Sequence, residues 1–294
     1  MRYLIGVDVG GSHVTCARVE TESRQILRAS VTRRHVDTNG PADQVMAVFA
    51  EAVLAAAGGT MEAIDGVGFA FPSPFDWENG ICLITPEQNK FKHLYGVNIR
   101  KELQTRLHFS GKVAFLNDAA CFAVGEYAAG ASKGVSHALG ITLGTGFGAS
   151  FTLNGKPVTS GDSVPKNGGE LWDVPYRSGI ADDYFSTRGL IAAWKQISGE
   201  DARGAKEIAD LAEQKGDARA FKVHEDFGTA LAEFLSPWLL RFGVKTLVVG
   251  GSIGRGLNLF EKTLTAGLPQ GVTVKPSLLG EDAQIVGAAS AVQM

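Results

Sequence analysis

Two aspartates and a set of glycine-rich turns are the residues of this chain whose types and spacing could do chemistry. Asp8 lies near the end of a β-prone run, two residues before a glycine pair, and Asp118 lies at a predicted junction between a strand and a helix. A glycine turn lets successive N–H groups approach an anion, because no Cβ stands in the way. Carboxylates near such a turn can hold Mg²⁺, often through water, or take a proton from a reacting hydroxyl. The combination indicates phosphate chemistry.

Each aspartate also has an ordinary structural interpretation. Asp8 could cap a nearby N–H as a turn former, and Asp118 could be the N-cap of the helix that follows it. A negative charge beside an anion-binding turn is unfavourable without a cation, so we favour a metal-binding role for Asp8. Since Asp118 lies between two phosphate-type turns in the sequence, we favour a general base at that position.

The glycine turns occur three times along the chain. The first two have matching hydrophobic rhythm and turn position, at residues 7–14 and 141–148, and therefore predict an internal repeat. The third, at residues 246–254, again runs from a β-branched strand into glycines. The candidate nucleotide-binding residues are Gly10, Gly11, Ser12, Gly144, Thr145, Gly146, Gly250, Gly251 and Ser252.

The elements around these residues can be read from the periodicity of the sequence. Three β-rich runs near the N-terminus predict an antiparallel meander, and an apolar run at residues 64–71 predicts a strand that leads into a loop stiffened by two prolines. Because loops at the carboxyl ends of strands often contact ligands, Ser73 in this loop is a candidate substrate-binding residue. The meander strands are predicted at residues 3–9, 14–20 and 26–32, and the main helices at 40–58, 99–107, 119–129, 179–194, 204–215 and 217–242.

Length, charge and cysteine usage exclude several classes of function. The 294 residues suit two domains, since domains commonly run to about 100–150 residues. A net charge of −3 without a basic cluster argues against nucleic acid as a partner. The first apolar run is interrupted by Asp8, so we expect no signal peptide or membrane span, a cytoplasmic location and small-molecule partners. The three cysteines form no C-x-x-C pair, so we expect no zinc site.

The motifs in their order resemble those of the ROK sugar kinases, within the actin/hexokinase/Hsp70-like ATPase superfamily. The matching segments are residues 8–12, 117–119, 143–146, 169–170 and 250–252, and the resemblance spans essentially the whole chain. It implies an α/β fold with two lobes of related design, in which duplicated mixed sheets are flanked by helices as in ribonuclease H. It places a smaller lobe at residues 1–118 with a C-terminal helix at about 282–294, a larger lobe at 119–281, and ATP in the cleft between them.

The resemblance also implies roles for particular residues. The turns at residues 10–12 and 144–146 would face the phosphates, and residues 250–252 would lie near the nucleoside. Asp118 corresponds to the family's catalytic base, which takes the proton from a sugar hydroxyl. ATP, Mg²⁺ and a homodimer are further implications. The positions that correspond to sugar contacts are Asn89, Asn117, Glu170 and Asp182.

One segment departs from the family pattern. Asp173 stands where members of the family commonly carry a histidine, and no cysteine follows it before Asp182, so the family's zinc motif is missing. The sequence therefore leaves the substrate open between a hexose, an N-acetylhexosamine and another small molecule, and the donor open between ATP and polyphosphate. A non-catalytic sugar or nucleotide sensor is the alternative from another class.

Overall fold

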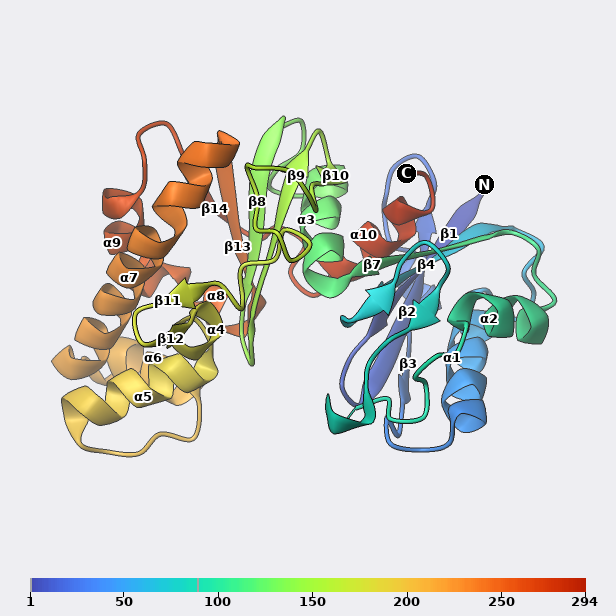
Figure 1. Ribbon diagram of the computed structural model, residues 1–294, viewed down its shortest axis with the longest axis horizontal. Coiled ribbons are helices and arrows are strands. Elements are labelled where there is room, and N and C mark those ends of the chain that lie inside the picture. The colour runs from blue at the N-terminus through green and yellow to red at the C-terminus, as the bar shows by residue number, and fades with distance from the viewer. Residues whose placement is uncertain (1, 89) are drawn as a thin grey trace. The chain divides into compact units, whose positions relative to one another are not determined.

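The computed structural model describes residues 2–88 and 90–294, and Asn89 lies outside the described residues. The chain forms two compact units. The first unit comprises the N-terminal residues through Ala129 together with Glu281–Met294, and the second unit comprises Gly130–Gly280. Each unit has a five-stranded mixed sheet with helices packed against it (Figure 1). The duplicated mixed sheets expected from the sequence are therefore confirmed.

In the sheet of the first unit, the carboxyl ends of three parallel strands lie at the same end of the sheet. Its strand order is β3-β2-β1-β4-β7, in which β1 pairs antiparallel with β2 and parallel with β4, and β4 pairs parallel with β7. In register, Asp8 lies beside Ala70, and Phe71 lies beside Asn117. The carboxyl ends of the parallel strands therefore carry both candidate acidic positions. The strands are β1 (Tyr3–Val9), β2 (His13–Glu20), β3 (Thr32–His35), β4 (Ile64–Phe71) and β7 (Lys112–Asn117).

Helices cover both faces of this sheet (Figure 1). Alternate residues of β7 point to opposite faces, as expected for a strand. Phe115 packs in the core formed with α1 and α2, whereas Ala114 packs in the core formed with α10. The helices are α1 (Ala42–Ala56), α2 (Ile99–Leu107), α3 (Asp118–Ala129) and α10 (Asp282–Ala291), and the short elements are η1 (Arg28–Ser30), β5 (Phe75–Asp76), β6 (Ile81–Cys82) and η2 (Pro86–Gln88).

Helix α10 packs almost directly on the backbone of its neighbours. A Cβ added at Gly287 would lie 1.8 Å from the Cys121 carbonyl oxygen, and one at Gly125 would lie 2.0 Å from the Ala283 carbonyl oxygen. These glycines let α3 approach α10 more closely than side chains would allow. Helix α3 consequently belongs to the first unit, and the division falls after Ala129, whereas the sequence-based boundary falls after Asp118.

The close packing of α10 also leads to a prediction about stability. A Cβ at Gly68 of β4 would lie 1.7 Å from the Ala288 carbonyl oxygen of α10. We expect Gly68→Ala to lower the free energy of unfolding by about 1–3 kcal/mol or more, because backbone must move to accommodate it. Urea denaturation measures the change. Gly204→Ala is the matched control, since a Cβ there meets nothing within 4 Å, and equal losses in the two variants would contradict the packing argument.

The second unit repeats the sheet plan of the first. Its strand order is β10-β9-β8-β13-β14, with β8 antiparallel to β9, and with β8, β13 and β14 parallel. Strand β8 thus takes the place that β1 has in the first unit, so the internal repeat predicted from the glycine turns is confirmed in the topology. The strands are β8 (His137–Leu143), β9 (Phe147–Leu153), β10 (Lys156–Pro157), β13 (Thr246–Gly250) and β14 (Thr273–Pro276), with a separate hairpin of β11 (Pro175–Tyr176) and β12 (Gly179–Ile180).

The helices of the second unit share one large core with its sheet. Leu139 and Phe151 of the sheet pack in the same cluster as Trp194 and Leu235 of the helices. Helices α5, α6, α7 and α9 lie on the same side of this sheet in Figure 1. The helices are α4 (Ala181–Tyr184), α5 (Thr187–Ser198), α6 (Ala205–Lys215), α7 (Ala218–Phe242), α8 (Gly251–Gly254), η3 (Leu257–Leu259) and α9 (Glu261–Gly267).

Two predicted elements were wrong in detail. The third meander strand, predicted at residues 26–32, is β3 at Thr32–His35, because the Ser30 hydroxyl binds the Leu27 carbonyl oxygen at 2.6 Å and bends the chain into a 3-10 turn. The helix predicted at residues 179–194 begins as a strand and is broken between α4 and α5. Among the described residues, no helix is both long enough and apolar enough to cross a membrane.

Candidate active site

The first glycine turn joins β1 to β2 and presents its backbone to solvent. The Gly10 amide donates to the His13 carbonyl oxygen at 2.9 Å, which closes the turn. Gly10, Gly11 and Ser12 are exposed, and a Cβ at Gly11 would meet nothing within 4 Å. Because packing does not require glycine at position 11, the residue leaves room for a group from outside the chain.

Asp118 and Asn117 are fixed at the junction of β7 and α3. The Asn117 Oδ1 accepts from the Ala119 amide at 2.8 Å, and the Asp118 Oδ1 accepts from the same amide at 2.9 Å. Both side chains therefore accept from the first turn of α3. Asp118 has the capping contact that its structural interpretation requires, but Asn117 makes the same contact. The Asn117 Nδ2 donates to the Ser73 Oγ at 2.9 Å, which joins the proline loop after β4 to this junction.

The carboxylates of Asp8 and Asp118, at the carboxyl ends of β1 and β7, interact through their charges. Burial raises the pKa of Asp8 to about 6, with the charges of Asp118 and Glu281 acting in the same direction and Arg33 opposing them. Solvent reaches Asp118, yet the protein around its carboxylate reduces its hydration and raises its pKa, while the Ala119 amide and Lys90 act against that rise. A buried carboxylate whose charge is further disfavoured by a second carboxylate suits a bound cation.

The donor set at Asp8 fits magnesium better than a metal that needs a complete protein cage. In the part of the chain that the structure describes, no group of three or more His, Cys, Asp or Glu side chains could hold a metal ion. Mg²⁺ usually keeps several waters and is bound by one or two carboxylates together with substrate phosphates. Asp8 next to an open glycine turn provides that arrangement.

The second glycine turn joins β8 to β9 and is clamped at both ends. The Gly144 carbonyl oxygen accepts from the Thr187 amide at 2.7 Å and from the Thr187 Oγ1 at 2.9 Å. At the other end, the Phe147 amide donates to the Asp182 Oδ1 at 2.6 Å. Arg188 forms an ion pair with the Asp182 Oδ2. The segment containing α4 and α5 therefore sets the shape of this turn.

The third glycine turn lies against the second but differs from it in shape. Here β13 leads into α8 rather than into a hairpin, and Gly251 has a φ of +83°. A Cβ at Gly251 would lie 2.3 Å from the Leu143 carbonyl oxygen, and a Cβ at Gly144 would lie 3.3 Å from the Ser252 Oγ. The second and third turns are therefore neighbours, as a shared nucleotide site requires.

The segment that departs from the family pattern is organised by an exposed tryptophan. The Trp172 Nε1 donates to the Glu170 Oε2 at 2.6 Å, and the Trp172 carbonyl oxygen accepts from the Asp182 amide at 2.9 Å. The Trp172 side chain is 43% exposed although it is large and apolar. Asp173, at the position of the family's histidine, accepts from the Asn167 side-chain amide.

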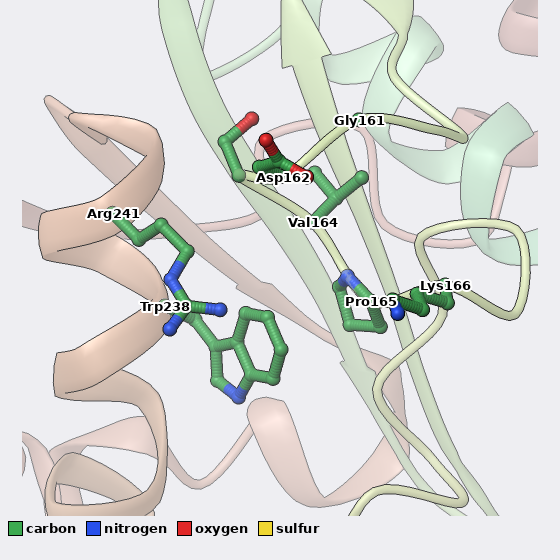
Figure 2. A pocket seen from close by; sticks show the side chains of 8 residues that line it. Gly161, Asp162, Val164, Pro165, Lys166, Trp238 and Arg241 are labelled. Carbon is green, nitrogen blue, oxygen red and sulfur yellow. The ribbon is translucent and has the colours of Figure 1, made fainter.

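A surface pocket of about 630 Å³ lies elsewhere in the second unit. Figure 2 shows Trp238 and Arg241 of α7 on one side and the loop of residues 161–166 on the other. The Arg241 guanidinium lies over the Trp238 ring at 5.2 Å. None of the residues predicted from the sequence as site residues lines this pocket, so it supports none of those assignments.

The structure groups the predicted residues within each unit. The first unit brings together the acidic strand ends, Ser73, Asn117 and the first turn, and the second unit brings together the second and third turns with Asp182. Sequence reasoning missed Thr187 and Arg188, which touch the second turn or its aspartate. Their only sequence signal is that they follow an acidic pair at a predicted helix start.

The comparisons with known proteins identify the family of this chain. The model of the ROK family matches residues 4–294. A glucokinase from Thermotoga maritima is 32% identical, over 99% of this chain and 97% of that protein. An N-acetyl-D-glucosamine kinase from Vibrio cholerae is 26% identical, over 87% and 86%. The solved structure of a ROK family glucokinase from Streptomyces griseus, in complex with glucose and AMPPNP, superimposes with a TM-score of 0.75 at 23% identity, over 99% and 100%.

Duplicated mixed sheets with glycine turns at their hairpins define the actin-like ATPase fold, which these structural relatives share. The chain belongs to the ROK family. Within that family its class is that of the sugar kinases.

Proposed function

We propose that this protein transfers the γ-phosphoryl group of ATP to a hydroxyl of a hexose, as a glucokinase-like enzyme. The observation that carries the proposal is the Asp118 carboxylate, which is oriented at the end of β7, reachable by solvent and raised in pKa. A carboxylate with a raised pKa is a stronger base, which is what removing a proton from a hydroxyl requires. The 32% identity to a glucokinase over nearly the whole chain supports the choice of substrate class.

In the proposed reaction Asp118 accepts the proton of the sugar hydroxyl as that oxygen attacks the γ-phosphorus. The new bond joins the sugar oxygen to phosphorus, and the bond that breaks joins phosphorus to the β–γ bridging oxygen of ATP, which leaves with ADP. Such a transfer depends mainly on positioning and on offsetting charge. The Ala119 amide orients the Asp118 carboxylate, and the Ser73 hydroxyl orients the Asn117 side-chain amide.

The glycine turns take the nucleotide in this proposal. The turns at residues 10–12 and 144–146 face the phosphates, with the amides of Gly10 and Gly144 closing the turns themselves, and residues 250–252 lie near the nucleoside. The fixed N–H groups need little rearrangement when charge develops. Asp8 would hold Mg²⁺, which would supply positive charge to offset that of the phosphates.

On the sugar side the proposal assigns contacts to side chains that present oxygen and amide groups. Glu170 is held by the Trp172 indole and belongs to the segment that differs from the family pattern. The structure does not describe Asn89, whose sugar contact stays a prediction from the resemblance. The proposed sugar contacts are Ser73, Asn89, Asn117, Asp118 and Glu170, and the family resemblance adds Asp182 to this set.

Glu170→Gln tests the sugar side. We expect KM for the sugar to rise about 10- to 100-fold, because a charge-assisted hydrogen bond to a hydroxyl is replaced by a neutral one. KM for ATP should change little. Steady-state kinetics with each substrate varied in turn measures both. Glu207→Gln, which removes a carboxylate of an exposed ion pair on α6, is the control, and a rise in KM for ATP alone would contradict the assignment.

The alternative substrate is an N-acetylhexosamine, which the similarity to an N-acetyl-D-glucosamine kinase favours. Polyphosphate is an alternative donor, because a glycine turn binds a phosphate group whatever it is attached to. A non-catalytic sensor is a further alternative. A homodimer and a cytoplasmic location stay predictions.

Release of ADP by the purified protein tests the proposal. The assay contains Mg-ATP with glucose, mannose, fructose, N-acetylglucosamine, N-acetylmannosamine or no sugar. We expect turnover that requires a hexose and is fastest with glucose. Fastest turnover with an N-acetylated sugar selects the alternative substrate. Stabilisation by sugar or ATP without any turnover would show a sensor.

A further inference from the structure

Both carboxylate oxygens of Asp182 have a partner inside the second unit. Its Oδ1 accepts from the Phe147 amide at 2.6 Å, directly after the second glycine turn, and its Oδ2 pairs with the Arg188 guanidinium. Only 16% of the Asp182 side chain is exposed. A Cβ at Gly146 would lie 3.1 Å from the Asp182 Oδ1, so the carboxylate lies against the turn itself.

Arg188 places one nitrogen on this carboxylate, and most of its side chain is exposed. The Arg188 side chain is 65% exposed, and Asp182 is its one ion-pair partner among the described residues. An exposed ion pair of this kind contributes little to stability. A guanidinium has five N–H donors in a planar fork, so holding one end still leaves donors for a phosphate.

The position of Arg188 is fixed to the turn by two independent connections. Thr187, its neighbour at the start of α5, binds the Gly144 carbonyl oxygen with both its amide and its hydroxyl. Asp182 binds the other end of the turn and the guanidinium at once. A carboxylate next to an anion-binding turn would repel phosphate, and Arg188 supplies the positive charge that offsets it.

We propose that Arg188 binds a phosphate of the nucleotide held at the Gly144–Gly146 turn, and that Asp182 is a positioning residue for this arginine and for the turn. This assignment rests on the proposed function, since it takes the turn to be a phosphate site. It gives Asp182 a role on the nucleotide side of the reaction in place of the sugar contact that the family resemblance implies.

The test compares Arg188→Ala, Arg188→Lys and Asp182→Asn with the unaltered protein. We expect Arg188→Ala to raise KM for ATP about 10- to 100-fold, the effect of losing a charge-assisted contact, with KM for the sugar nearly unchanged. Arg188→Lys should recover part of the loss, because it keeps the charge but not the fork. Asp182→Asn should raise KM for ATP in the same direction and by less. Arg203→Ala, which removes an exposed arginine paired with Glu207, is the matched control and should have no effect.

Binding of MgADP measured by calorimetry without sugar provides a second readout that does not depend on turnover. The same order of affinities is expected: unaltered protein, then Arg188→Lys, then Arg188→Ala. If the unaltered protein phosphorylates no sugar, the proposed function fails and the calorimetry still decides the role of Arg188. Unchanged KM for ATP and unchanged MgADP affinity in Arg188→Ala would overturn the inference. A rise in KM for the sugar alone would overturn it too, and would return Asp182 to the sugar.

Discussion

Asp118→Asn is expected to lower kcat about 10²- to 10⁴-fold, the range for loss of a general base. The variant should fold normally, because Asn117 also caps α3 by accepting from the Ala119 amide at 2.8 Å. Asparagine keeps the shape and the acceptor oxygen of the aspartate and removes only its basicity. KM for ATP should change little, since the loss falls on the chemical step. Steady-state kinetics and thermal unfolding of the same preparation measure both effects.

A second aspartate serves as the matched control for Asp118. Asp217 is the N-cap of α7 and accepts from the Arg219 amide, as Asp118 accepts from the Ala119 amide. If Asp118 were only a helix cap, Asp118→Asn and Asp217→Asn would leave kcat equally intact. If kcat for Asp118→Asn stays within about threefold of the unaltered protein, Asp118 is not the general base, because loss of a general base lowers the rate far more than that.

The pH profile adds a test of the same group. Because its surroundings raise the pKa of Asp118, its basic form is lost at a higher pH than for an ordinary aspartate. The rate of the unaltered enzyme should therefore fall on the acid side before an ordinary aspartate would be protonated. The residual rate of Asp118→Asn should lose the part of this fall that belongs to Asp118 and keep only the part that belongs to Asp8.

Local patterns predicted the elements well where one face of an element is buried. The apolar run at residues 64–71 and the helix at residues 99–107 have the same bounds in the structure as in the sequence prediction. The alternation and the helical period in these stretches are set by burial, which the sequence records directly. The repeated glycine turns likewise predicted the duplicated sheets, because a similar turn between similar strands builds a similar hairpin.

The contacts that shape the candidate site could not be read from the sequence in this way. Asp182 binds Phe147, 35 positions earlier, and looks in the sequence like an acidic residue in the first turn of a helix. Gly251 resembles the other turn glycines, yet its left-handed φ and its approach to Leu143 give it a structural role that they lack. Both features arise only when distant segments pack, so no local period reports them.

The division of the chain into two units falls after Ala129, whereas the sequence-based boundary falls after Asp118, for a related reason. The strand–helix junction at Asp118 is the natural place to divide the chain when only local elements are visible. The decisive contacts are those of Cys121 and Gly125 with α10, which is more than 150 residues further along the chain. Close backbone packing between α3 and α10 thus determines the unit to which α3 belongs.

Asp8→Asn is expected to stabilise the metal-free protein at pH 8 by up to about 3 kcal/mol, while lowering kcat by about 10²-fold or more. The pKa of Asp8 rises from 3.8 to about 6 on folding, chiefly through burial and next through the charge of Asp118. A carboxyl with a raised pKa binds its proton more tightly in the folded state, so ionising it costs stability. Asparagine avoids this cost but cannot carry the negative charge that Mg²⁺ requires.

The sign of this effect can be checked across pH. Well below the ordinary pKa of 3.8 the carboxyl is protonated in both the folded and the unfolded states, so the variant and the unaltered protein should differ little. As pH rises from about 4 to 6, only the unfolded state loses the proton, and the unaltered protein should lose stability relative to Asp8→Asn until the difference levels off. Urea denaturation at several pH values measures it, with Asp226→Asn, an exposed aspartate paired with Lys222, as the control. A difference that does not vary with pH would contradict the prediction.

The two aspartates also make a joint prediction, because the charge of Asp118 is one cause of the raised pKa of Asp8. In an Asp118→Asn background Asp8 should ionise at a lower pH, and the stabilising effect of Asp8→Asn at pH 8 should become smaller. A double-mutant cycle at pH 8 measures this coupling as the difference between the two effects of Asp8→Asn. Mg²⁺ with nucleotide should stabilise the unaltered protein more than Asp8→Asn, since the cation offsets the repulsion that the substitution has already removed. The cost of ionising Asp8 and the capacity of this carboxylate to bind a cation are then two results of one electrostatic arrangement.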